Sequence, residues 1–321
     1  MTNSTINSTI FGKAYEYACI LAISNLLNSI RPFEIIKNKS LEIAKLRFNE
    51  ISEIEREEML KSATAGIKAI IDMEPCITED GKDLLTISLQ ADDVAKTGDI
   101  RDVIIIRRSI NWEIGISVKH NHAALKHSRL SPLIDFGKVW LNIPCSKTYF
   151  EDIKPTFDYL LELKNKEELW ENIKNKDKII YAPILNAFIK EFKNLYEQNK
   201  NYVVSKIIKY LLGSNDNDYY KLIHYNNHIT RVQPFNINGQ LNKASNMNKP
   251  KTTFSKISLP TKILDLSFKT NSLTTIHLTM DNGWAISFRI HNASKKVETS
   301  LKFDIQLLGQ PANLFYIDVK W

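Results

Sequence analysis

The sequence predicts a mixed α/β (α+β) protein in which helices flank a core sheet and a basic, strand-rich part follows. Apolar side chains recur every three or four positions in the first 72 residues, which is typical of amphipathic helices. Short β-branched runs between polar turns take over from residue 84 to 119 and again beyond residue 213. Of the 321 residues, 43% are hydrophobic and only 10 are glycine and 10 proline, which excludes a disordered or collagen-like chain.

The elements can be assigned in chain order. A first helix is predicted over residues 11–30, because its apolar residues keep a helical spacing and Pro32 ends the run. A second helical region covers residues 40–72, with Ser52 and Glu55 spaced as an internal capping box. The other predicted elements are strands at 84–89, 102–106 and 112–119, helices at 123–139 (interrupted at Pro132), 150–174 and 182–212, and strands at 275–280, 284–291 and 301–307.

Positive charge is concentrated near the end of the chain. The formal charge of +7 combines −2 for residues 1–199 with +9 for residues 200–321. A basic segment of this kind indicates an anionic partner, and nucleic acid is the commonest one, although charge can also serve solubility alone. Together with the change in texture at Gly213, this predicts two parts, residues 1–212 and residues 213–321.

Cysteine use and the N-terminal segment indicate a cytoplasmic protein. Cys19, Cys76 and Cys145 are far apart and form no CxxC pair, which argues against a disulfide scaffold and a structural zinc site. The first ten residues are polar and lack the basic and apolar regions of a secretory signal. No apolar run approaches the roughly 20 residues that a membrane span needs, so no membrane partner is expected.

The strands at 102–106 and 112–119 carry the strongest candidate chemistry. If they form an antiparallel hairpin, Asp102 lies close to the end of the second strand, where Lys119 shares a face with Ser117. Phosphodiester hydrolysis uses such a pair, because a carboxylate can hold a divalent cation while a lysine orients water or stabilises charge. The alternative is an ordinary hairpin with a polar end.

Hydrogen-bond donors suited to DNA follow this hairpin directly. Three of the seven histidines lie between residues 120 and 131, but His122 and His127 are five apart and do not share a helical face, which argues against zinc. The segment instead offers donors for phosphate oxygens or base edges. The candidate DNA-binding residues here are Asn121, Lys126, His127 and Arg129, and the alternative is a solvated basic helix.

The order Asp102, then Ser117-x-Lys119, resembles the PD-(D/E)XK nuclease core. The sequence departs from that pattern at Ser117, where the family usually carries Asp or Glu and where serine cannot supply a full negative charge. The run Gly12 to Tyr17 resembles the first helix of these nucleases, so Glu16 is the candidate compensating acid, although it can equally be a solvated helix residue. Asp99, in the preceding turn, is the rival of Asp102 as the principal metal ligand.

Longer runs resemble type II restriction endonucleases of the HaeIII type. They cover Gly98 to Val103, Trp112 to His122 and Lys126 to Ser131 near the hairpin. Further on they cover Gly283 to Ala293 and Ser300 to Asp304. The resemblance implies a restriction-endonuclease-like core sheet flanked by helices, with a helical insertion, in residues 1–212. Residues 213–321 would form the basic β-rich part that recognises DNA.

The resemblance also implies an activity and its participants. The expected enzyme cuts both strands of double-stranded DNA at a short palindrome, GGCC for this type, leaves blunt ends and needs Mg²⁺. Asp102 and Lys119 would be catalytic with support from Asp99 and Glu16, and Asp102 and Glu16 would hold the metal. The residues that could contact DNA in the later run are Arg289, His291 and Asn292. A cognate DNA methyltransferase would act on the same site, and a palindromic target favours a homodimer.

Three other functions share some of these sequence features. Pro144-Cys145 imitates the nucleophile dipeptide of cytosine-5 methyltransferases, but no Gly-rich cofactor loop follows an early strand, which argues against that enzyme. A non-catalytic DNA-binding protein is compatible with the basic segment and the missing second acid. A repair or recombination nuclease of the same superfamily would share the core.

Overall fold

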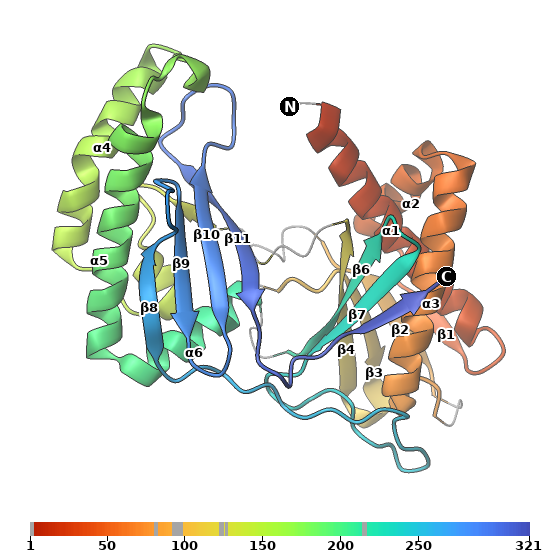
Figure 1. The fold of residues 1–321 in the computed structure, drawn as a ribbon. Helices are drawn as coiled ribbons and strands as arrows, with labels where there is room; N and C mark the ends of the chain where they lie inside the picture. The colour runs from red at the N-terminus through yellow and green to blue at the C-terminus, as the bar shows by residue number, and fades with distance from the viewer. Residues whose placement is uncertain (1–2, 80–82, 92–98, 122–124, 126–127, 214–216) are drawn as a thin grey trace. The chain divides into compact units, whose positions relative to one another are not determined.

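The protein is a mixed α+β structure with two sheets flanked by helices, as the sequence predicts (Figure 1). The computed structural model describes residues 3–79, 83–91, 99–121, 125, 128–213 and 217–321; the candidates Lys126 and His127 lie outside them. The chain forms two compact units. The first comprises Met1–Ala123, Ser214–Ile257 and Asn313–Trp321, and the second comprises Ala124–Gly213 and Ser258–Ala312.

The first unit holds a seven-stranded sheet. Its strand order is β1-β2-β3-β4-β6-β7-β12, with β1–β2 and β4–β6 parallel and the other pairs antiparallel. The strands are β1 (Phe33–Ile35), β2 (Leu85–Leu89), β3 (Val103–Arg107), β4 (Trp112–His120), β6 (Tyr219–Tyr225), β7 (Ile229–Phe235) and β12 (Ile317–Lys320), and the helices are α1 (Asn3–Leu27), α2 (Lys39–Glu50) and α3 (Glu53–Met73).

The predicted helical region 40–72 consists of two helices. Ile51 is extended and ends α2, and Ser52 then caps α3 in a capping box with Glu55, so the predicted box marks a helix start. Helix α3 packs closely on the sheet at Gly66, where an added Cβ would lie 2.3 Å from Leu222 Cδ1. Residues 236–251 contain no helix or strand.

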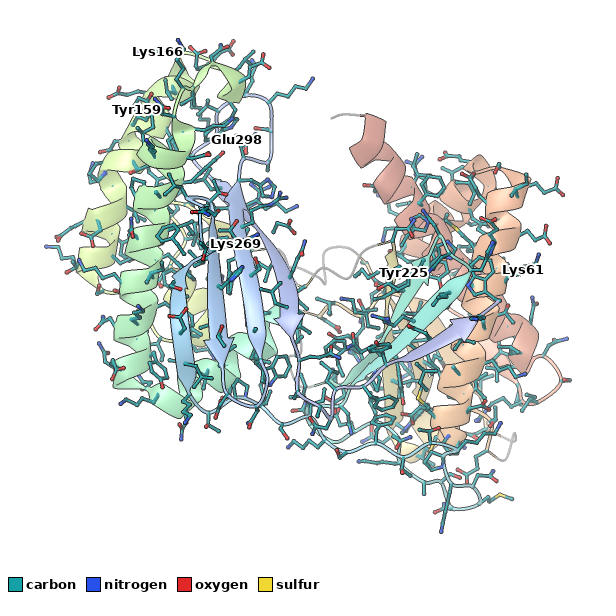
Figure 2. All side chains as sticks on the ribbon, viewed as in Figure 1. Lys61, Tyr159, Lys166, Tyr225, Lys269 and Glu298 are labelled. Carbon is teal, nitrogen blue, oxygen red and sulfur yellow. The ribbon has the colours of Figure 1, made fainter. Side chains whose placement is uncertain are left out.

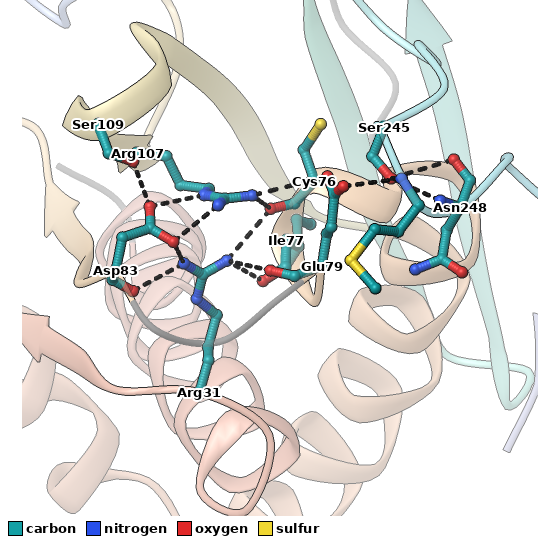
Figure 3. Close-up of polar contacts among 10 residues, drawn as sticks. Arg31, Cys76, Ile77, Glu79, Asp83, Arg107, Ser109, Ser245 and Asn248 are labelled. Atoms are coloured by element: carbon teal, nitrogen blue, oxygen red, sulfur yellow. Dashed lines mark hydrogen bonds and ion pairs between the residues drawn. The ribbon is translucent and has the colours of Figure 1, made fainter.

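Strands β3 and β4 form the predicted antiparallel hairpin, with Val103 paired to Ile116. A 3₁₀ turn over Arg108–Ile110 joins them, and Asn111 closes it in the left-handed region at φ 50°. An ion-pair cluster anchors this end, where the Asp83 carboxylate binds Arg31 at 2.6 Å and Arg107 at 2.7 Å (Figure 3). The pKa of Asp83 is lowered by the hydrogen bonds from Arg107, so this carboxylate stays ionised.

The second unit pairs a five-stranded antiparallel sheet with helices. The strand order is β5-β11-β10-β9-β8. Rings of Phe188, Phe288 and Phe303 meet between helix and sheet, with centroids 5.5 to 6.1 Å apart. The strands are β5 (Ser128–Leu130), β8 (Ile263–Phe268), β9 (Thr275–Met280), β10 (Ala285–His291) and β11 (Leu301–Gly309), and the helices are α4 (Lys147–Asn165), α5 (Ala182–Gln198) and α6 (Lys200–Leu211).

The helix predicted over residues 123–139 is wrong where the structure describes it. Residues Ser128–Leu130 form an edge strand that pairs with Leu301–Phe303, and only Gly137–Leu141 makes a short π-helical turn. The pairing lies some 170 residues away in sequence, so a local pattern could not reveal it. Each compact unit contains residues from before and after position 212. The expected division into a nuclease part, residues 1–212, and a DNA-recognition part, residues 213–321, stays a prediction.

None of the helices in the described ranges combines the length and the apolar character of a membrane span.

Candidate active site

Asp102 and Lys119 converge beside the hairpin, as their positions on antiparallel strands predict. Lys119 Nζ lies 3.3 Å from Asp102 Oδ2. The same oxygen accepts a 2.6 Å hydrogen bond from the Val118 backbone N–H, and Ser117 Oγ is 3.5 Å away. Both charged side chains are about one quarter exposed, so the pair is reachable from solvent. The backbone bond fixes one carboxylate oxygen and leaves Oδ1 without a partner among the described residues.

Glu16 approaches this pair from α1. Its side chain is buried, and Lys13 Nζ lies 3.1 Å from its Oε2. Burial, and then the neighbouring Asp102 carboxylate, raise the pKa of Glu16 to about 8. Because its side chain is buried, the helix glutamate is not the solvated residue of the alternative interpretation. A cation bound nearby would favour the ionised form of Glu16.

The described residues contain no cluster of three or more His, Cys, Asp or Glu side chains that could enclose a metal. Asp102 and Glu16 are acidic groups near Lys119. Mg²⁺ is commonly bound by one or two carboxylates while it keeps several waters and contacts substrate phosphates. A two-carboxylate site suits a hard divalent cation that completes its shell with water and DNA.

Asp99 is engaged by Arg101 instead of facing this pair. Arg101 Nε donates to Asp99 Oδ1 at 2.9 Å, and Gln90 Nε2 donates to Oδ2 at 2.9 Å. Burial alone would raise the pKa of Asp99, but these hydrogen bonds outweigh it and lower the pKa. Arg101 also holds Glu113 at 2.7 Å. Asp99 thus orders the turn that precedes Asp102.

Lys221 is a residue that sequence reasoning missed. It lies on β6 directly opposite Ser117 in the parallel register and is only 4% exposed. Burial, and then the Lys119 charge, lower the pKa of Lys221 to about 7. In the sequence, Lys221 stands out only as the one lysine within the apolar and aromatic run Tyr219–Tyr225. Nothing in the sequence predicts that this run pairs with β4, so its position near Lys119 could not be inferred.

A column of four rings lies at the end of β4, directly after Lys119. Phe11 stacks on His120 at 5.2 Å, His120 on His224 at 5.0 Å, and His224 on Trp321 at 5.5 Å. Asn121 closes the adjacent turn, where the Asn226 backbone N–H donates to its Oδ1 at 3.1 Å. Rings from α1, β6 and the C-terminal residue therefore pack at the end of β4. Sequence reasoning did not predict this column.

The second unit contains the remaining DNA-binding candidates. Arg129 and Arg289 extend into solvent, with side chains 44% and 59% exposed, although Arg289 Nη2 also reaches Asp304 at 3.0 Å. His291 Nδ1 lies 2.7 Å from the Asn292 carbonyl oxygen. Asn292 is used internally, because its Oδ1 accepts from Tyr181 at 3.2 Å and its Nδ2 donates to the Ser294 carbonyl at 2.8 Å.

Comparisons with known proteins found a matching family model and a similar sequence. The family model described as HaeIII restriction endonuclease matches residues 12–311. A relative named type II restriction enzyme HaeIII, from Haemophilus aegyptius, is 43% identical over 311 residues, which cover 97% of each chain. No solved structure matches.

Proposed function

The chain belongs to the HaeIII restriction endonuclease family and is thus a type II site-specific deoxyribonuclease, and from this premise we propose that it cuts both strands of duplex DNA at GGCC. The cut leaves blunt ends, Mg²⁺ is the working cation, and the reaction takes place in the cytoplasm. The observation that carries the chemical part is the Asp102–Lys119 pair at 3.3 Å with the buried carboxyl group of Glu16 beside it.

Asp102 and Glu16 hold the cation in this proposal. The hydrogen bond from Val118 orients the Asp102 carboxylate, and Oδ1 remains available among the described residues. Lys13 balances part of the Glu16 charge when the cation is absent. When bound, Mg²⁺ neutralises charge on the scissile phosphate and polarises the attacking water.

Lys119 contacts the scissile phosphate in this proposal. Its ammonium group is held next to Asp102 and offers donors to the non-bridging oxygens, whose charge grows in the transition state. Ser117 replaces the acid that PD-(D/E)XK nucleases usually carry, and its hydroxyl faces Asp102 Oδ2. Asp99 supports the site through Arg101, by ordering the turn before Asp102.

Duplex DNA is the partner, and the second unit supplies much of its binding surface. Arg129, Arg289 and His291 offer donors toward solvent, and arginine reads the O6 and N7 acceptors of guanine well, which suits a GC-only site. Asn292 supports this surface from within, while Asn121 borders the catalytic lysine. A homodimer matches the twofold symmetry of a palindrome, and a cognate methyltransferase protects the same site in host DNA.

A plasmid digestion tests this proposal. Wild type, Asp102→Ala and Lys119→Ala are incubated with supercoiled plasmid with and without Mg²⁺, and Asp158→Ala on α4 is the matched control for loss of an exposed carboxylate. We expect wild type and the control to give the same discrete fragments only with Mg²⁺, with ends that map to the centre of GGCC. Binding without metal-dependent cutting by wild type would reject the proposal in favour of a non-catalytic DNA-binding protein.

A further inference from the structure

The five-stranded sheet of the second unit has one covered face and one open face. The buried residues of its central strands alternate along the chain, as in Ile286, Phe288 and Ile290 of β10, and helices of the unit pack on that side (Figure 1). The intervening side chains point the other way. On that face, no described element of the same unit covers Arg289, which is 59% exposed.

A row of basic side chains crosses three neighbouring strands of the open face. Arg129 on β5 is directly opposite Lys302 on β11, and Lys302 is directly opposite His291 on β10. Lys302 has no ion-pair partner among the described residues. Like charges directly opposite each other destabilise a sheet. Glu298 Oε2, 4.0 Å from Arg129 Nη1, counters the repulsion between Arg129 and Lys302, and a polyanion would counter it further. Lys269 and Glu298 lie at the same end of the sheet (Figure 2).

A second row of the same face carries hydrogen-bond donors and acceptors. Gln306 on β11 is opposite Ser287 on β10, and Ser287 is opposite His277 on β9. None of these three side chains has a hydrogen-bond partner within the described ranges. Between the two rows, Asp304 holds the guanidinium of Arg289 at 3.0 Å and so limits its orientations.

The separation of the two rows is close to the width of the major groove. Lys302 and Gln306 are four residues apart on one strand, which separates the rows by roughly 13 Å. The major groove is about 12 Å wide, so when the first row contacts phosphates on one groove edge, Arg289 and the second row lie across the groove, where base edges are exposed. Side chains that line a surface without bonding to one another are free to read bases.

We infer that the open face of this sheet is the DNA-reading surface of the enzyme, with Arg129, Lys302 and His291 binding phosphates and Arg289, Gln306 and His277 reading base edges. The inference rests on the proposed function for the identity of the DNA. It adds which residues of the open face contact phosphates and which contact bases. Phosphate contacts set affinity for any sequence, whereas base contacts set the preference between sequences.

Salt-dependent binding tests the phosphate row. Affinities of the full chain for a GGCC duplex and an unrelated duplex are measured in Ca²⁺ over a range of salt, for wild type and for the double variant Arg129→Gln/Lys302→Gln. The control is Lys164→Gln/Lys193→Gln, which removes the same charge from exposed positions on α4 and α5. We expect the test variant to weaken binding to both duplexes alike and to reduce the slope of log K against log salt by about 2. Equal effects of the test and control variants would overturn the phosphate row.

Gln306→Ala tests the reading row with a different signature. We expect an unchanged salt slope and a fall of about tenfold in the preference for GGCC over a single-mismatch duplex. A retained preference in both Gln306→Ala and Arg289→Ala would overturn this part.

Chemical acetylation of the wild-type chain gives a measurement that does not depend on any variant folding. Bound DNA should protect Lys302 but not Lys193, and equal labelling of Lys302 with and without DNA contradicts the inference. These outcomes are separate from those of the plasmid digestion. A wild type that cuts at GGCC while Lys302 stays unprotected rejects only this surface, and a wild type that does not cut rejects the proposed function.

Discussion

Arg101 lies across the backbone of Gly115 so closely that a Cβ at position 115 would be 2.0 Å from Arg101 Cδ and 2.8 Å from Arg101 Cβ. The missing side chain at Gly115 lets the buried arginine cross β4 and bind Asp99 on one side and Glu113 on the other. Since Asp102 follows Arg101 directly, this close approach helps to set the position of the Asp102 carboxylate, the proposed metal ligand.

Gly115→Ala should therefore destabilise the first unit and reduce cleavage. The added methyl group displaces the base of the Arg101 side chain, and overpacking of this kind costs about 1–3 kcal/mol. Urea unfolding and plasmid cleavage measure the two effects. Gly12→Ala is the control, because no atom lies within 4 Å of its added Cβ and alanine favours a helix; if both substitutions behave alike, the packing argument is wrong.

Glu16→Gln should separate stability from catalysis. Without a divalent cation, the variant should unfold at a higher temperature than wild type, because it removes an acid that burial and Asp102 disfavour in its charged form. With Mg²⁺, cleavage should fall by at least about 100-fold, equivalent to about 2.7 kcal/mol of transition-state stabilisation. Glu57→Gln, on the exposed surface of α3, should change neither quantity, and wild-type cleavage by Glu16→Gln would exclude Glu16 as a ligand.

Lys221→Met should stabilise the protein at neutral pH. The folded state lowers the pKa of Lys221 to about 7 while the unfolded chain keeps it near 10.5, so the folded state binds fewer protons between these values. The wild-type free energy of unfolding therefore rises with pH through this window, and the penalty is complete below pH 7. We expect a gain of about 1–4 kcal/mol for the variant at pH 7 that shrinks toward pH 10, measured by urea unfolding. A gain that does not depend on pH would contradict the assignment.

His224 should make the wild-type protein sensitive to mild acid. Burial, with His120 and His228 nearby, lowers the pKa of His224 to about 4, so the unfolded chain binds more protons between pH 4 and 6.5. The contribution of this residue to stability is complete above pH 6.5 and is lost as the pH falls toward 4. His120, whose pKa burial also lowers, adds to the effect, while Glu55 opposes it there.

His224→Phe provides the comparison. It keeps a ring between His120 and Trp321, with Tyr15 beside it, but removes the titrating group. Its free energy of unfolding should depend less steeply on pH by at most about 1.4 kcal/mol per pH unit in this window. Parallel curves for the variant and wild type would assign the acid sensitivity to other groups.

Local patterns were enough to predict most of the elements. The β3–β4 hairpin was predictable because β-branched runs, alternation and a polar turn all lie within 18 residues, and these features place Asp102 near Lys119. The capping box at Ser52 was also correct, since a helix cap depends on residues three apart. The segment at Ser128–Leu130 was misassigned as helix because its partner, β11, lies far along the chain.

The sequence by itself determined the family, many of the helices and strands, and the paired acid and lysine of the hairpin, because each depends on residues that are close in the chain or on motifs that can be matched directly. Only the tertiary structure brought Glu16 and Lys221 to that pair, engaged Asp99 with Arg101, and aligned Arg129, Lys302 and His291 across three strands. Such groupings depend on strand register and helix packing, and a shift of one residue in register would turn every side chain of a strand to the opposite face.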